Sequence, residues 1–252
     1  MNIKWIAKLY IYKALSALKG NCPGKFDDTT YKNKRIIIIG PASSSTNYLN
    51  GDEIDEFDII LRINKSTAIV PGMKDKIGSR TDILYHCCDE NKTYGGGHIL
   101  PELLKEQKNL AVLFTYYDLS VIANVYKLSY LYPKVRFCIT EKELYVDLAK
   151  KYSAKMPTTG LQALNHVLAA DFKELHITGF TFFKTPYAAG YRDNHQAASS
   201  ATMLAKSTGN HDPDDELRIF NELYSDRVKH KKIFLDSTLS QIIEQHQVER
   251  AF

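Results

Sequence analysis

Residues 35–45 read Arg-Ile-Ile-Ile-Ile-Gly-Pro-Ala-Ser-Ser-Ser, an apolar run that drops into a turn of small residues. A short apolar run bounded by turn residues is typical of a strand buried on both faces. The turn lets backbone N–H groups and hydroxyls approach anionic oxygens of a phosphorylated ligand. The spacing matches neither the dinucleotide-binding loop nor the P-loop. We predict ligand contacts from Gly40, Ser43, Ser44 and Ser45.

Strands and helices alternate along the rest of the chain. Apolar runs predict strands at 58–63, 82–85, 110–114, 135–139, 175–178 and 232–235, and helical spacing predicts helices at 101–107, 119–128, 141–152, 159–170, 213–224 and 238–247. This alternation predicts an α/β fold, a single Rossmann-like domain with a mostly parallel central sheet and helices on both faces. In such sheets ligands bind beyond the carboxyl ends of the strands. Residues 185–210 are predicted as a long loop that serves a ligand or is mobile.

Composition narrows the class of protein. With 252 residues, 44% of them hydrophobic, the chain fits one large domain, predicted at 35–252, preceded by a helix at 1–20 and a polar connector at 21–34. A net charge of +4 from scattered basic residues argues against nucleic-acid binding. The four cysteines form neither a C-x-x-C motif nor a disulfide framework, which predicts a cytoplasmic setting. The run His86-Cys87-Cys88-Asp89 fits a strand end better than a metal site.

The N-terminal helix at 1–20 carries lysines among Trp5 and several aliphatic residues. The lysines interrupt every apolar stretch, so we predict neither a membrane span nor a signal peptide. Two interpretations stay open. A basic helix of this kind can lie on an anionic membrane surface, here the inner face of the membrane, or it can dock on the domain.

Two later segments each precede a predicted helix. In Pro157-Thr158-Thr159-Gly160, Thr158 or Thr159 is a candidate N-cap, and the helix N-terminus behind it suits a phosphate. A plain capped helix explains the same residues equally well. His211 lies just before the acidic start of the helix at 213–224. Its unperturbed pKa lies near neutrality, so it is a candidate general base.

Together these segments resemble the three motifs of the eukaryotic-type sialyltransferase family. Order and spacing agree over about 35–223. The large motif corresponds to the strand and glycine turn at 36–40, a polar helix start at 52–58, Leu61-Arg62-Ile63-Asn64 and Gly78-Ser79-Arg80-Thr81. The small motif corresponds to 157–160 through Gly179-Phe180, and the very small motif to His211 and Glu216. The two cysteines that join the large and small motifs in secretory-pathway members are absent, which leads us to expect a bacterial member.

The chain departs from the family pattern in two places. Pro41 stands where the family usually has an asparagine that contacts the nucleotide, and proline offers neither an N–H nor an amide side chain. That contact must come from Ser43–Ser45 or be lost. The aromatic-rich third motif is echoed by Tyr191 and Asp193, with His195 in place of the family histidine.

The resemblance implies a modified GT-A-like fold and an inverting, metal-independent glycosyltransferase without a cofactor. It would move sialic acid from CMP-sialic acid to a glycan hydroxyl, in the synthesis of surface polysaccharide or lipooligosaccharide. His211 would be the general base and Glu216 an orienting residue. The remaining positions that match the motifs would bind the nucleotide and stabilise its leaving phosphate: Asn64, Thr158, Thr159, Gly160 and Gly179.

Three alternatives stay open. CMP-Kdo is also a CMP-linked 2-keto acid, so the nucleotide motifs do not distinguish a Kdo transferase from a sialyltransferase. Pro41 and the blurred third motif favour a non-catalytic nucleotide- or glycan-binding module. Asp212-Pro213-Asp214 is a nominal Asp-x-Asp metal motif, although its place at a helix start favours capping.

Overall fold

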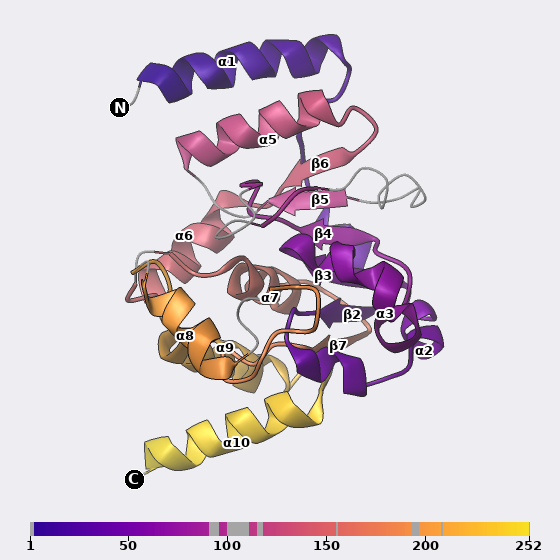
Figure 1. Ribbon diagram of the computed structural model, residues 1–252, viewed down its shortest axis with the longest axis vertical. Helices are drawn as coiled ribbons and strands as arrows, with labels where there is room; N and C mark the ends of the chain where they lie inside the picture. Colours follow the sequence, from indigo (N-terminus) through magenta and orange to yellow (C-terminus); the bar gives the residue numbers. More distant parts are fainter. Residues whose placement is uncertain are drawn as a thin grey trace.

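Eight strands form the central sheet in the computed structural model, which describes residues 3–90, 96–99, 111–114, 118–154, 156–192, 197–207 and 209–251 (Figure 1). The strand order is β1-β6-β5-β4-β3-β2-β7-β8, and every pairing within these ranges is parallel. The strands are β1 (Gly24–Lys25), β2 (Arg35–Ile39), β3 (Ile59–Ile63), β4 (Ile83–Tyr85), β5 (Ala111–Phe114), β6 (Arg136–Ile139), β7 (Glu174–Thr178) and β8 (Lys232–Leu235). The chain runs from β2 outward through β3 and β4, then returns to place β7 on the other side of β2, so the order reverses at β2.

Helices cover both faces of this sheet. The described α-helices are α1 (Ile3–Leu18), α2 (Gly51–Asp55), α3 (Val70–Ile77), α5 (Leu119–Leu131), α6 (Lys142–Lys151), α7 (Thr159–Ala169), α8 (Ala198–Ser207), α9 (Pro213–Arg227) and α10 (Ser237–Ala251). Three short 3-10 helices are η1 (Asp28–Tyr31), η2 (Ser43–Asn47) and η3 (Asn64–Ile69). α1 lies outermost at one end of the molecule, packed on α5, and α10 lies at the opposite end (Figure 1).

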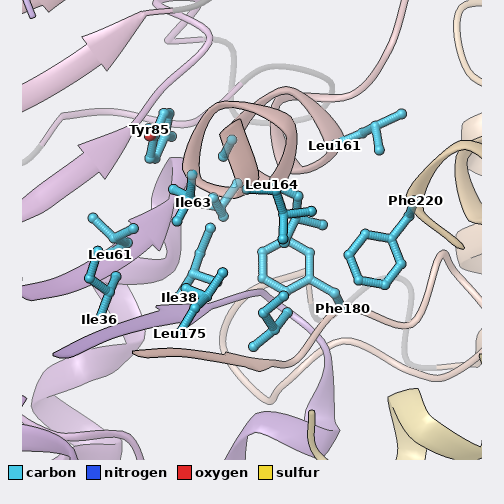
Figure 2. Packing of buried hydrophobic residues seen from close by; sticks show 14 of the residues in the cluster. Ile36, Ile38, Leu61, Ile63, Tyr85, Leu161, Leu164, Leu175, Phe180 and Phe220 are labelled. Carbon is cyan, nitrogen blue, oxygen red and sulfur yellow. The ribbon is translucent and has the colours of Figure 1, made fainter. Parts of the chain in front are cut away.

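The larger core lies between the sheet and α7. Ile36 and Ile38 of β2 point into it beside Leu175 of β7, and α7 contributes Leu161 and Leu164 (Figure 2). Ile37 and Ile39 point the other way and pack against α2 and the residues after it. Because each face of β2 is covered, successive residues are all buried, which is why this strand is a continuous apolar run rather than an alternating one.

Two arginines in the Leu-Arg-x-Asn and Gly-Ser-Arg-Thr segments hold the loops beside β3. The guanidinium of Arg62 is fully buried and donates to the carbonyls of Ile77 (2.6 Å) and Gly78 (3.2 Å) at the end of α3. Arg80 donates to the carbonyl of Asp55 at the end of α2 (2.9 Å). Helix carbonyls at these ends have no partner within the helix, and a cation there also complements the helix dipole. These two motif arginines therefore stabilise the scaffold.

The α/β fold and its mostly parallel sheet are confirmed. The predicted strands agree with the observed ones to within about one residue, and the predicted helix at 101–107 lies outside the described residues. Apolar spacing did not predict α2 or α3, because α2 has only five residues and α3 has eight, with Pro71 and Gly72 in its first turn. The polar helix start at 52–58 that the family resemblance implies overlaps α2.

Two predictions need correction. The segment 21–34 is more than a polar connector: β1 pairs with β6, while Phe26 and Tyr31 are buried in the larger core. The stretch 185–210 is also not irregular throughout, because α8 lies within it. Its alanines and serines form a helix that packs on α9, a tertiary contact that composition alone does not reveal.

Candidate active site

A cavity of about 390 Å³ opens at the carboxyl ends of β2, β3, β4 and β7. This is the edge at which parallel sheets bind ligands, and it includes the point between β2 and β7 where the strand order reverses. Each of these strands sends the residues that follow it into the lining: Pro41 and Ala42, Asn64, Cys87 and Asp89, and Gly179 and Phe180. The start of α7 and the loop before α9 complete the wall with Thr158, Thr159, Gly160, His211 and Glu216.

Gly40 and Gly179 let β2 and β7 come together at this edge. A Cβ atom on Gly40 would lie 2.3 Å from the carbonyl oxygen of Gly179, and one on Gly179 would lie 2.5 Å from the carbonyl oxygen of Gly40. Gly179 also has a backbone φ of +74°, which residues other than glycine rarely adopt. Gly179 lines the cavity, so it serves both the close approach of the strands and the shape of the site.

Backbone N–H groups of the turn after β2 are hydrogen-bonded within the protein, although Pro41 and Ala42 line the cavity. The N–H groups of Ala42 and Ser43 donate to the carbonyls of Gly179 and Pro186, each at 3.0 Å. The carbonyl of Pro41 accepts from the N–H of Ala188 (2.9 Å). Contrary to prediction, these N–H groups are therefore not offered to an anion, because they anchor the segment that follows β7.

The predicted serines lie outside the cavity lining. The Ser44 hydroxyl donates to Asp236 (3.1 Å), and the buried Ser45 hydroxyl donates to the Ala42 carbonyl (2.8 Å). Asp236 is itself buried and also accepts from the Gly179 N–H (2.8 Å). Asp236 thus ties the β2 turn to the end of β7. A nucleotide contact from Ser43–Ser45 stays a prediction, and the lining residues at this turn are Pro41 and Ala42.

Asn64 occupies the end of β3 in a left-handed conformation, with a φ of +51°. Its Oδ1 accepts from the N–H of Cys87 (3.0 Å). Asn64 thereby connects the ends of β3 and β4 at the cavity, whose lining also includes Tyr191. Asparagine tolerates this backbone conformation better than most residues, which accounts for it at this position.

Thr158 is confirmed as the N-cap of α7, and its hydroxyl accepts from the N–H of Leu161 (3.1 Å). Glu216 holds Thr158 in place: its carboxylate accepts from the Thr158 N–H (2.8 Å) and from the Thr158 hydroxyl (2.7 Å). Both polar groups of Thr158 are therefore engaged within the fold. The first N–H groups of the helix itself belong to Thr159 and Gly160, have no carbonyl partner within the helix, and lie at the cavity wall. N–H groups at such a helix start are able to bind an anion.

Glu216 is 2% exposed, and burial raises the pKa of its carboxyl to about 7. The folded state therefore holds this proton more tightly than the unfolded state, whose carboxyl titrates near 4.5. The free energy of unfolding should fall by about 3 kcal/mol through this group as the pH rises from about 4.5 to about 7. Urea unfolding of the wild type and Glu216→Gln at several pH values measures this, because glutamine does not titrate.

The control for this measurement is Glu222→Gln, on the exposed side of α9. Its difference from the wild type should not show the fall expected for Glu216→Gln. A wild-type-minus-Glu216→Gln difference that stays constant between about pH 4.5 and about pH 8 would contradict the raised pKa.

His211 is oriented by Met156, which lies shortly before α7. Its Nδ1 lies 2.9 Å from the Met156 carbonyl oxygen, and the Met156 N–H donates to the Asn210 carbonyl (3.1 Å). A carbonyl can only accept, so Nδ1 carries the proton and Nε2 is left as the basic nitrogen of the neutral ring. Burial lowers the pKa of His211, and the charge of Arg192 acts in the same direction. A neutral imidazole with an oriented Nε2 at a cavity wall is able to accept a proton.

Tyr152 is a positioning residue that sequence reasoning missed. Its hydroxyl accepts from the Asp212 N–H (2.6 Å) and donates to Glu216 (3.2 Å). It thereby joins the His211 loop to the carboxylate that holds Thr158. Tyr152 follows α6 and is 60 residues from Asp212 in sequence, so no local signal connects the two. A tyrosine at the end of an amphipathic helix is an ordinary core residue by pattern.

The aromatic part of the lining is strained. Phe182 and Phe183 both line the cavity and both have positive φ angles, +49° and +62°. Bulky residues rarely adopt this conformation, and such strain gathers at ligand sites where the surrounding structure imposes it. Tyr187 and Tyr191 continue the wall, with ring centroids 5.3 Å apart. Tyr191 of the predicted third motif thus lies at the site, whereas Asp193 and His195 lie outside the described residues.

The candidate metal motifs have other roles. Asp212 is the N-cap of α9, as predicted, and accepts from the N–H groups of Asp214 and Asp215. The Asp214 carboxylate pairs with Lys184 (3.1 Å). At the end of β4, His86 accepts from the N–H of Cys88 (2.9 Å). Within the described ranges of the chain, no group of three His, Cys, Asp or Glu side chains is placed to hold a metal ion.

The parallel sheet with its cavity at the β2–β7 reversal defines a GT-A-like α/β fold. Among solved structures, the chain is similar to a mammalian sialyltransferase, with a TM-score of 0.56, 17% identity, and coverage of 92% of this chain and 77% of that one. A mammalian sialyltransferase in complex with Gal-β-1,3-GalNAc-ortho-nitrophenol gives a TM-score of 0.54, 14% identity, and coverage of 93% and 86%.

A tyrosine-to-phenylalanine variant of the sialyltransferase Cst-II, in complex with CMP, gives a TM-score of 0.51 at 14% identity and covers 81% of each chain. Cst-II comes from Campylobacter jejuni. At these identities the similarity establishes the shared fold. No protein-family model and no curated protein matches the sequence.

Proposed function

We propose that this protein is a bacterial sialyltransferase-like enzyme, which transfers sialic acid from CMP-sialic acid to a glycan hydroxyl with inversion and without a metal ion. The observation that carries the proposal is His211 with its Nδ1 held by the Met156 carbonyl, on the same cavity as the helix-start N–H groups of Thr159 and Gly160. A base and an anion site on one cavity are what transfer from a nucleotide-linked sugar needs. The shared fold with sialyltransferases supports the same assignment.

The proposed chemistry uses the two sides of the cavity. Nε2 of His211 takes the proton of the acceptor hydroxyl as its oxygen attacks the anomeric carbon. The bond from that carbon to the phosphate oxygen breaks, and CMP leaves with the bonding electrons. The N–H groups of Thr159 and Gly160, at the positive end of the α7 dipole, stabilise the charge on the leaving phosphate. Asn64 and Gly179 lie where the nucleotide would meet the strand ends.

Release of CMP tests the proposal. The protein is incubated with CMP-sialic acid or CMP-Kdo, together with acceptor glycans that include lipooligosaccharide-derived oligosaccharides, with and without EDTA. We expect acceptor-dependent CMP release from CMP-sialic acid that EDTA does not reduce. Preference for CMP-Kdo would assign the enzyme to the alternative donor. Binding of CMP with no turnover of either donor would support the non-catalytic module instead.

We also propose that α1 contacts an anionic membrane at the inner face. One side of α1 packs on α5, and the opposite side is an outward apolar stripe with large side chains at helical spacing, exposed by 58–85%: Ile3, Tyr10, Ile11 and Leu18. Lys4 and Lys13 are exposed on either side of it. Apolar side chains flanked by lysines match a bilayer with anionic headgroups. No α-helix within the described ranges is both long and apolar enough to cross a membrane.

Vesicle co-sedimentation measures this contact. We expect the protein to bind vesicles with about a third anionic lipid, and salt to weaken the binding because lysine–headgroup attraction is screened. Ile11→Asp with Leu18→Asp should abolish it. Val248→Asp changes an exposed apolar residue of α10, at the other end of the molecule, and should have no effect (Figure 1). Equal binding to neutral vesicles, or binding that survives the α1 changes, would refute the proposal.

A further inference from the structure

The charges on the cavity lining are unevenly distributed. Arg192 is the only lysine or arginine among the described lining residues. It follows Tyr191, and its guanidinium carbon lies 6.0 Å from the centre of the Tyr191 ring. The same ring is contacted from elsewhere by Lys65, whose Nζ lies 5.3 Å from its centre but which is not part of the lining. Of these two neighbours of the Tyr191 ring, only Arg192 belongs to the described cavity lining.

The position of Arg192 relative to His211 points to what this cation meets. Arg192 and His211 both line this cavity, and the positive charge of Arg192 contributes to the lowered pKa of His211. In the proposed reaction His211 must reach the oxygen that attacks the anomeric carbon. A 2-keto acid sugar carries its carboxylate on that same carbon. A cation near His211 is thus near the carboxylate of any such donor.

Resting on the proposed function, we infer that Arg192 is the specificity residue that binds the sugar carboxylate of the donor. Guanidinium–carboxylate pairs are strong because two parallel N–H donors match the two oxygens. The carboxylate stays ionised from ground state to transition state, so the pair stabilises both. Such uniform binding acts on KM rather than kcat. The inferred ligand class is a CMP-linked sugar acid, and a neutral CMP-sugar would lose this contact.

The test compares binding of CMP, the substrate analogue CMP-3FNeuAc and the methyl ester of that analogue to wild type and Arg192→Gln. We expect the variant to lose about 10- to 100-fold in affinity for CMP-3FNeuAc, the range of a charged hydrogen bond. Affinity for CMP should change by less than about threefold. The wild type should discriminate against the neutral ester by a similar factor, and the variant should not. That coupling assigns the effect to the carboxylate.

Lys65→Gln is the control for Arg192→Gln. It removes a positive charge from the same tyrosine ring but lies outside the lining, so it should leave the discrimination against the ester intact. An equal loss for CMP and for CMP-3FNeuAc would overturn the inference, because Arg192 would then bind the phosphate or the nucleoside. Unchanged affinity for CMP-3FNeuAc, or no discrimination against the ester by the wild type, would also overturn it. Failure of the wild type to bind CMP at all would instead refute the proposed function.

If Arg192→Gln does not fold, the comparison of CMP-3FNeuAc with its methyl ester is made between the wild type and a second variant, Arg192→Lys. Lysine keeps the charge without the planar fork, so we expect a smaller loss than with glutamine. In steady-state assays the same variants should raise KM for the donor with kcat within about threefold. The acidic limb of the pH profile should move to higher pH in Arg192→Gln, because the charge that lowers the pKa of His211 is gone.

Discussion

His211→Ala is expected to lower kcat by about 100- to 10,000-fold, the contribution of a well-placed general base. The variant retains the α7 N-terminus and the strand ends, so its affinity for CMP should stay within about threefold of wild type. Turnover is measured by CMP release and affinity by calorimetry. Because a carbonyl fixes the proton on Nδ1, we attribute the whole loss to the missing Nε2 base.

The pH dependence of the activity gives an independent test of His211 as the base. The base works when neutral, so activity should fall as the pH drops through the pKa of His211. Burial and the charge of Arg192 lower that pKa below 6.5, so wild-type activity should persist below pH 6.5. His230→Ala, an exposed histidine in the turn after α9, is the matched control and should behave as wild type. Unchanged turnover in His211→Ala would remove this residue as the base.

The second large effect concerns stability. Gly40→Ala should destabilise the protein by about 3 kcal/mol, at the upper end of overpacking costs, because the new Cβ would lie 2.3 Å from a backbone carbonyl that cannot rotate away. Relief requires β2 and β7 to separate at the edge that forms the cavity. We therefore expect weaker CMP binding together with a lower urea midpoint.

Gly72→Ala is the matched control for this change. Gly72 lies in α3, and a methyl group added there would meet no atom within 4 Å beyond its chain neighbours and the backbone of its own helix, so alanine should be neutral or stabilise by up to about 1 kcal/mol. An unfolding free energy of Gly40→Ala equal to that of wild type would show that the two strands do not approach as closely as described.

Much of the fold follows from short-range patterns. The isoleucine run of β2 indicates a strand covered on both faces, and the threonine before α7 and the aspartate before α9 indicate N-caps. Each of these signals depends on neighbours within a few residues, which is why the sequence reveals them. The turn at 40–45 misleads for the same reason. Its glycine and serines are typical of an anion cradle, whereas the N–H groups of Gly40, Ala42 and Ser43 are taken up by residues about 140 positions away.

The sequence by itself determined an α/β sheet, a capped helix at the strand ends and a histidine just ahead of an acidic helix. Only the tertiary structure decided what each group does. Glu216 binds both polar groups of Thr158 across 58 residues, which leaves the N–H groups of Thr159 and Gly160 at the cavity wall. The physical reason is that caps and strands arise from local backbone geometry, while the choice of hydrogen-bond partner depends on which distant groups packing brings within about 3 Å.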